Sequence, residues 1–84
     1  MNPGLQGVQA VAVLSARQIE CLLRISRGET SAEIAIALGL SRHTVDHYIG
    51  GACAKLGAKT RAQAVAIAIA RQQIPTPATD NGAD

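Results

Sequence analysis

The chain has 84 residues and a formal net charge of +2; 48% of its residues are hydrophobic, yet Tyr48 is its only aromatic residue. Such a length allows one small domain with a limited core. A core of Leu, Ile, Val and Ala favours closely packed helices over a sheet, which prefers β-branched and aromatic pairs. So little bulk argues against a deep substrate pocket, and therefore against an enzyme or a small-molecule receptor.

The charge is unevenly distributed along the chain. All eight Lys and Arg residues lie between Arg17 and Arg71, a segment that holds four of the six acids and therefore carries a net charge of +4. The other two acids, Asp80 and Asp84, lie near the C-terminus. The part that is predicted to fold is therefore basic.

Residues 1–13 are predicted to form an N-terminal extension. They carry no charge, and the apolar patch at residues 8–13 is expected to pack against another surface. The segment lacks the basic start of a secretory signal, and its apolar run is too short to cross a bilayer. We therefore expect a cytoplasmic protein in which Cys21 and Cys53 are reduced and act as small hydrophobic residues.

Capping signals predict four helices. Ser15 with Gln18 opens the first, which runs to Gly28, and Thr30 begins a short second helix that Gly39 ends.

The third predicted helix begins at Ser41, after a tight turn, and ends at Gly57. Thr60 caps a fourth helix that is predicted to run to about Gln73, because Pro75 cannot continue it. A short helix, a tight turn with a glycine and a longer capped helix are typical of a helix-turn-helix motif.

The fourth predicted helix is apolar on two sides. One stripe runs from Ala64 to Ile74, and Val65 and Ile69 form a second. A domain this small supplies only one internal partner, so the second stripe, together with Gln72, is predicted to mediate self-association.

Four motifs in combination resemble the LuxR-type (GerE-like) DNA-binding domain: LSARQIECL, GETSAEIAIALGLSRHTVDHYI, KLGA and RAQAVAIA. The resemblance covers residues 14–74, and residues 75–84 are predicted to form a disordered polar tail. It implies an all-α fold of four helices in a transcription regulator that is not an enzyme and needs no cofactor. It also implies a dimer on double-stranded DNA, with the third helix (about residues 42–56) in the major groove and the fourth helix at the dimer interface.

The chain departs from the family's pattern in three ways. Ala32 and Asp46 stand where the family often has basic or amide side chains, which removes two potential phosphate contacts. Gly50 and Gly51 replace basic residues. The family's usual regulatory domain is not found in this sequence, so a standalone DNA-binding domain is expected.

The predicted DNA-contacting residues are, in chain order, Ser41, Arg42, His43, Thr44, Asp46, His47, Lys55, Lys59 and Arg61. Arg42 can donate two hydrogen bonds to guanine, and Asp46 can accept one from cytosine N4. The helix N-terminus suits a phosphate oxygen, and the basic residues that flank the third helix suit the DNA backbone. Without the resemblance, a solvated polar face would be the preferred interpretation.

A metal site or a catalytic site at His43 and His47 is a weaker hypothesis than contact with DNA. The spacing of His43 and His47 suits metal ligands, but Cys21 and Cys53 lie on the core stripes of their helices. Asp46 and His47 are adjacent in a helix and therefore point in different directions. Neither a metal site nor a catalytic site is predicted.

The predicted function is sequence-specific regulation of transcription at the nucleoid, and RNA polymerase is a further candidate partner. The alternative is an interaction module that antagonises a larger LuxR-type regulator by forming heterodimers with it. Ala32, Asp46 and the glycine pair favour the alternative, and the basic third and fourth helices oppose it. The glycine pair has two interpretations: close approach of the backbone to a phosphate or a partner, or harmless fraying.

Overall fold

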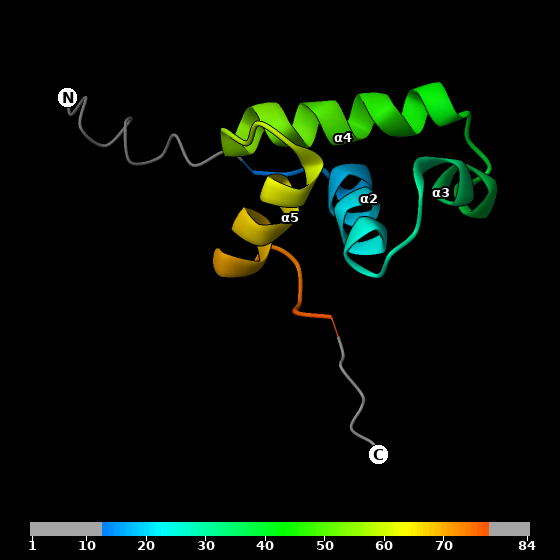
Figure 1. Cartoon of the computed structure of the whole chain (residues 1–84). Coiled ribbons are helices and arrows are strands. Elements are labelled where there is room, and N and C mark those ends of the chain that lie inside the picture. Colours follow the sequence, from blue (N-terminus) through cyan, green and yellow to red (C-terminus); the bar gives the residue numbers. More distant parts are fainter. Residues whose placement is uncertain (1–12, 78–84) are drawn as a thin grey trace, which may run out of the picture.

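The computed structural model describes residues 13–77, which form four α-helices in an irregular bundle (Figure 1). In chain order these are α2 (Ala16–Ser26), α3 (Ser31–Leu38), α4 (Arg42–Leu56) and α5 (Arg61–Ala70). The described part of the chain contains no strand, so the predicted all-α fold is confirmed. Most of the predicted N-terminal extension and C-terminal tail lies outside the described residues.

The first two helices begin with the capping boxes that the sequence predicts. The Ser15 hydroxyl oxygen accepts from the Gln18 backbone N–H at 3.1 Å, and the Gln18 side chain accepts from the Ser15 backbone N–H at 2.8 Å. Thr30 and Glu33 make the same reciprocal pair at the start of α3. Each box satisfies backbone donors that the first turn of a helix otherwise leaves unpaired.

Helix α5 differs from the prediction at its C-terminal end. It stops at Ala70 rather than at about Gln73, so Pro75 is not what ends it. Gln72 adopts the left-handed conformation, with φ of 59°, which breaks the helical hydrogen-bond pattern. The chain then turns back, and Ile74 enters the core with 3% of its surface exposed.

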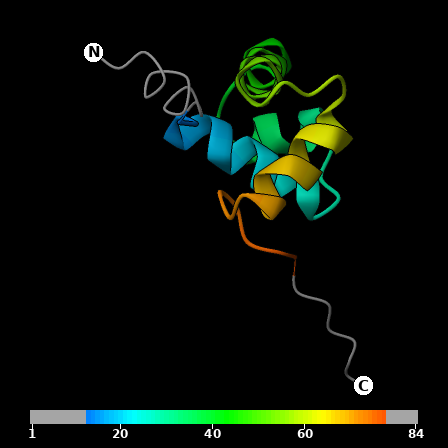
Figure 2. The same cartoon turned by 90° about the vertical axis from the view of Figure 1, so that its left-hand side faces the viewer.

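Helix α4 is shared between two clusters of buried side chains. The first joins α2, α4 and α5 and contains Leu14, Leu22, Ala52, Leu56, Ala64, Ala68 and Ile74. The second joins α2, α3 and α4 and contains Cys21, Ile34, Ala35, Val45 and Ile49. Figure 2, which looks nearly along α4, shows the other three helices on one side of it. The opposite side of α4 is therefore left uncovered by them.

Both cysteines take part in this packing, as predicted. Cys21 is fully buried in the second cluster, and Cys53 is half-buried against both clusters. Both are free thiols. None of the described helices is long and apolar enough to cross a bilayer.

Candidate nucleic-acid interface

Helices α3 and α4 form the predicted helix-turn-helix, and the turn between them is firmly held. Gly39 ends α3 in the left-handed conformation, with φ of 70°, which costs glycine little. The Leu40 backbone N–H then donates to the Ala35 carbonyl at 2.9 Å, and the Leu40 side chain packs against the second core cluster. The start of α4 is thereby fixed relative to α3.

Four of the predicted DNA-contacting residues lie together on α4: Arg42, His43, Asp46 and His47. Val45 and Ile49 are buried in the core, whereas His43 and His47 are exposed and the Arg42 side chain is 73% exposed. The Asp46 side chain is 41% exposed. A continuous polar strip therefore runs along the amino-terminal half of α4 on a rigid support.

The hydroxyls at the start of α4 are already engaged in its cap. The Ser41 hydroxyl oxygen accepts from the Thr44 backbone N–H at 3.0 Å, and its proton is donated to the Thr44 hydroxyl oxygen at 2.9 Å. The proton of the Thr44 hydroxyl remains a donor for an oxygen from outside. Of this pair, Thr44 is thus better placed to bind a phosphate than Ser41.

A polar cluster of Ser31, Asp46, Arg61 and Arg42 links three helices. The Asp46 carboxylate accepts from the Ser31 hydroxyl at 2.6 Å and from the Arg61 guanidinium at 3.3 Å. Arg61 also donates to the Ser31 hydroxyl at 2.8 Å, and Arg42 Nε lies 3.8 Å from the second Asp46 oxygen. The Ser31 hydrogen bond, followed by that from Arg61, holds the pKa of Asp46 below its ordinary value. Asp46 and Arg61, both predicted to contact DNA, are therefore joined to each other.

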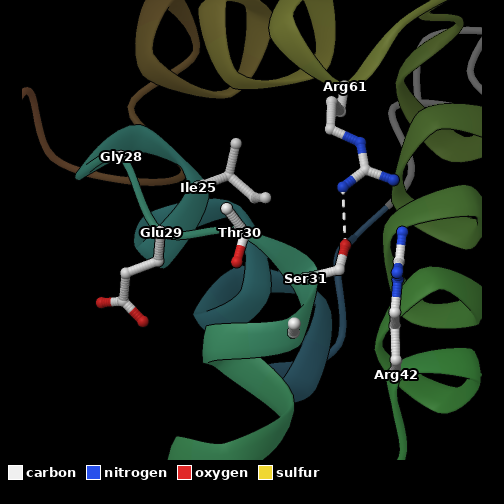
Figure 3. A pocket seen from close by; sticks show the side chains of 8 residues that line it. Ile25, Gly28, Glu29, Thr30, Ser31, Arg42 and Arg61 are labelled. Atoms are coloured by element: carbon white, nitrogen blue, oxygen red, sulfur yellow. Dashed lines mark hydrogen bonds between the residues drawn. The ribbon is translucent and has the colours of Figure 1, made fainter.

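An open hollow of about 630 Å³ lies beside this cluster, and its lining residues are Ile25, Gly28, Glu29, Thr30, Ser31, Ala32, Arg42 and Arg61. Figure 3 shows the guanidinium groups of Arg42 and Arg61 pointing toward each other next to Ser31. Glu29, on the same wall, is paired with Arg24 at 3.1 Å. The two arginines therefore supply the positive charge of the hollow.

The two lysines near the end of α4 differ from each other. Lys55 donates from Nζ to the Val13 carbonyl at 3.0 Å, which ties the end of α4 to the segment before α2. The Lys59 side chain is exposed, and within residues 13–77 only its backbone N–H has a partner, the Gln63 side chain at 2.6 Å. Lys59 is thus the more available of the two for a phosphate.

Val65 and Ile69, which the sequence predicts to form an apolar stripe separate from the core, also contribute to the core. Both are half-buried and pack against the first core cluster, because α5 crosses α2 and α4 at its edge. The exposed side of α5 carries alanines at helical spacing: Ala62, Ala66 and Ala70. Gln72, the third predicted interface residue, is exposed in the turn after α5.

His43 and His47 are both exposed on α4. The His47 ring lies 6.4 Å from that of Tyr48, which is half-buried. Among the residues that the structure describes, no three His, Cys, Asp or Glu side chains are grouped to hold a metal ion.

Known proteins with similar sequences are bacterial regulators of transcription. The family model of bacterial regulatory proteins, luxR family, matches residues 12–68. The transcriptional activator protein VanR of Vibrio anguillarum is 43% identical over 58 residues, which are 69% of this chain and 24% of VanR. The quorum sensing-dependent transcriptional regulator VjbR of Brucella ovis is 36% identical over 75 residues, 88% of this chain and 29% of VjbR. The chain thus spans less than a third of either relative, and it belongs to the LuxR family of bacterial regulatory proteins.

Proposed function

We propose that this chain is a sequence-specific DNA-binding regulator of transcription that acts as a homodimer, with α4 in the major groove. The observation that carries the proposal is the exposed amino-terminal half of α4, a helix that is packed in two core clusters. The two histidines are exposed there, and Arg42 lies beside them at the edge of the hollow. Preorganised side chains on a rigid helix are what reading of base edges requires.

Contacts to the DNA backbone would come from the ends of α4. At its N-terminus, the Thr44 hydroxyl and the positive end of the helix dipole suit a phosphate. Lys59, beyond its C-terminus, and Arg61, beside the hollow, suit further phosphates. Such contacts set the position of the protein, and the side chains between them select the sequence.

The homodimer is proposed to form through α5. Ala62 and Ala66 allow a second helix to approach closely, and the half-buried side chains of Val65 and Ile69 flank them. Gln72, exposed in the turn after α5, is the third residue proposed for this interface. Pairing two copies there would present two α4 helices to successive turns of a DNA site with two-fold symmetry.

The alternative function, a module that antagonises a larger LuxR-type regulator by heterodimerisation, has one observation in its favour. Asp46 is bonded to Arg61 and lies near Arg42, so it offsets part of the positive charge beside the proposed DNA surface. Selection of bound duplexes from a random library distinguishes the two functions. Enrichment of one two-fold symmetric motif supports the regulator; no enrichment, with formation of heterodimers with a LuxR-type regulator, supports the antagonist.

A further inference from the structure

Asp46 lies between two arginines that the proposed function assigns to DNA. Its two carboxylate oxygens face different partners: one accepts from Arg61 at 3.3 Å, and the other lies 3.8 Å from Arg42. Figure 3 shows that these two guanidinium groups converge on one place beside Ser31. Two cations that converge in this way are stabilised by an anion between them, and in the free protein Asp46 is that anion.

Ser31 determines where this anion stays. Its hydroxyl donates to Asp46 at 2.6 Å, and Ser31 has only 6% of its surface exposed, in a helix that packs against α4. Asp46 is therefore held by a neutral, buried donor as well as by the arginines. If either arginine side chain binds another anion instead, the Asp46 carboxylate is still held by Ser31.

The ion pairs themselves are open to competition. The side chains of Asp46 and Arg61 are 41% and 45% exposed, and that of Arg42 is 73% exposed. Ion pairs with such access to water are weak, because water and salt screen them. A DNA phosphate, which makes stronger bidentate bonds with guanidinium, can take either arginine.

We propose that the Asp46 carboxylate competes with DNA phosphates for the guanidinium groups of Arg61 and Arg42, and that it thereby limits binding to DNA of arbitrary sequence. In a non-specific complex both arginines could serve phosphates, but Asp46 competes for Arg61 and its retained carboxylate repels phosphates, so a phosphate contact is not made. In a specific complex Arg42 serves a base, and the penalty is smaller. Asp46 is thus a specificity-determining residue, an inference that rests on the proposed function.

The test compares Asp46→Asn with a matched variant, Glu20→Gln. Asparagine keeps an oxygen for Ser31 and Arg61 and removes only the charge. Glu20 is also a carboxylate between two arginines, Arg17 at 3.7 Å and Arg24 at 3.4 Å, and its variant changes the net charge equally. Glu20 lies on α2, which packs against the buried side of α4. Circular dichroism establishes that each variant is folded.

The affinity of each protein for a scrambled duplex is measured by fluorescence anisotropy between about 50 and 200 mM salt. For Asp46→Asn we expect the slope of log affinity against log salt to become steeper by about 0.9, the value for one further phosphate contact. Over the measured range, this difference in slope makes the affinity advantage of Asp46→Asn over the wild-type chain about 3.5 times larger at 50 mM salt than at 200 mM. Glu20→Gln should leave the slope unchanged.

A double-mutant cycle with Arg61→Gln tests whether Arg61 makes the additional phosphate contact. Arg61→Gln should change the salt slope little in the wild-type chain. In the Asp46→Asn background it should abolish the steepening of the slope. If Asp46→Asn and Glu20→Gln behave alike while the wild-type chain binds DNA, the competitor role of Asp46 is wrong and the proposed function stands. If the wild-type chain binds no duplex, both are wrong. Should Asp46→Asn be unfolded, Asp46→Ala replaces it, with the same expected steepening and the same contrary result.

Discussion

The side-chain amide of Gln18 occupies the space beside Gly51 in which another residue would place its β-carbon. A Cβ built on Gly51 would lie 2.7 Å from Gln18 Nε2, closer than such atoms approach in proteins. Gln18 cannot easily move, because its amide oxygen accepts from the Ser15 backbone N–H in the capping box of α2. Gly51 therefore permits α2 and α4 to pack closely, and the partner that approaches it is internal.

Gly50 and Gly51 should consequently respond in opposite directions to substitution by alanine. A Cβ on Gly50 would meet nothing within 4 Å, so Gly50→Ala should raise the free energy of unfolding by up to about 1 kcal/mol through helix propensity. Gly51→Ala should lower it by about 1 kcal/mol, because the strain of overpacking exceeds the gain in propensity. Denaturant unfolding measures both, and equal stabilisation by the two changes would contradict this role of Gly51.

The features that the sequence predicts well are local ones. Ser15 with Gln18 and Thr30 with Glu33 mark helix starts because each signal is complete within four residues. The contact between Gln18 and Gly51 could not be predicted, since it depends on how α2 crosses α4.

The same limit applies to the candidate site. The periodicity of α4 predicts which of its residues are exposed, because one helix determines its own faces. The bonds of Asp46 to Ser31 and Arg61 span 15 residues in each direction and arise only when three helices meet. The end of α5 differs from the prediction for another reason: Gln72 adopts a positive φ that its residue type does not signal.

A charge on the exposed side of α5 should separate the proposed dimer without unfolding the monomer. Ala66 is the suitable position, because it is exposed whereas Val65 and Ile69 also contribute to the core. Ala66→Glu is expected to sediment as a folded monomer under conditions in which the wild-type chain is a dimer. Ala37→Glu, at an exposed position of α3, is the control and should remain dimeric. A dimer that persists in Ala66→Glu would place the interface elsewhere.

The polar cluster around Asp46 should make stability depend on pH in the acid range. Ser31, then Arg61, lowers the pKa of Asp46 in the folded state, so its contribution is fully present above the unfolded value of about 3.9. The contribution is lost as the pH falls through the lower folded pKa. The wild-type chain should therefore be more stable than Asp46→Asn at pH 6, and thermal unfolding should show the difference shrinking below about pH 4. A difference that stays constant down to pH 2 would rule this out.

The two thiols should react at different rates with an alkylating reagent. Burial, followed by the nearby charge of Glu20, raises the pKa of Cys21, and its side chain is fully buried, so little thiolate forms or meets the reagent. Cys53 is only half-buried. Mass spectrometry should find Cys53 labelled first in the folded chain and both thiols labelled equally in denaturant. Equal rates in the folded chain would mean that Cys21 is not protected by the core.

The most direct test of the proposed function is the effect of Arg42→Ala on two duplexes at one salt concentration. The duplexes are the site obtained by selection and its scrambled counterpart. Because Arg42 is proposed to bond to a guanine, its loss should weaken binding to the selected site by roughly 1–3 kcal/mol and binding to the scrambled one much less. Arg71→Ala, at an exposed arginine after α5, removes the same charge and should weaken both duplexes slightly and equally. The predicted result is that Arg42→Ala loses more affinity for the selected site than for the scrambled duplex. A loss of affinity by the same factor on both duplexes would contradict base reading by α4.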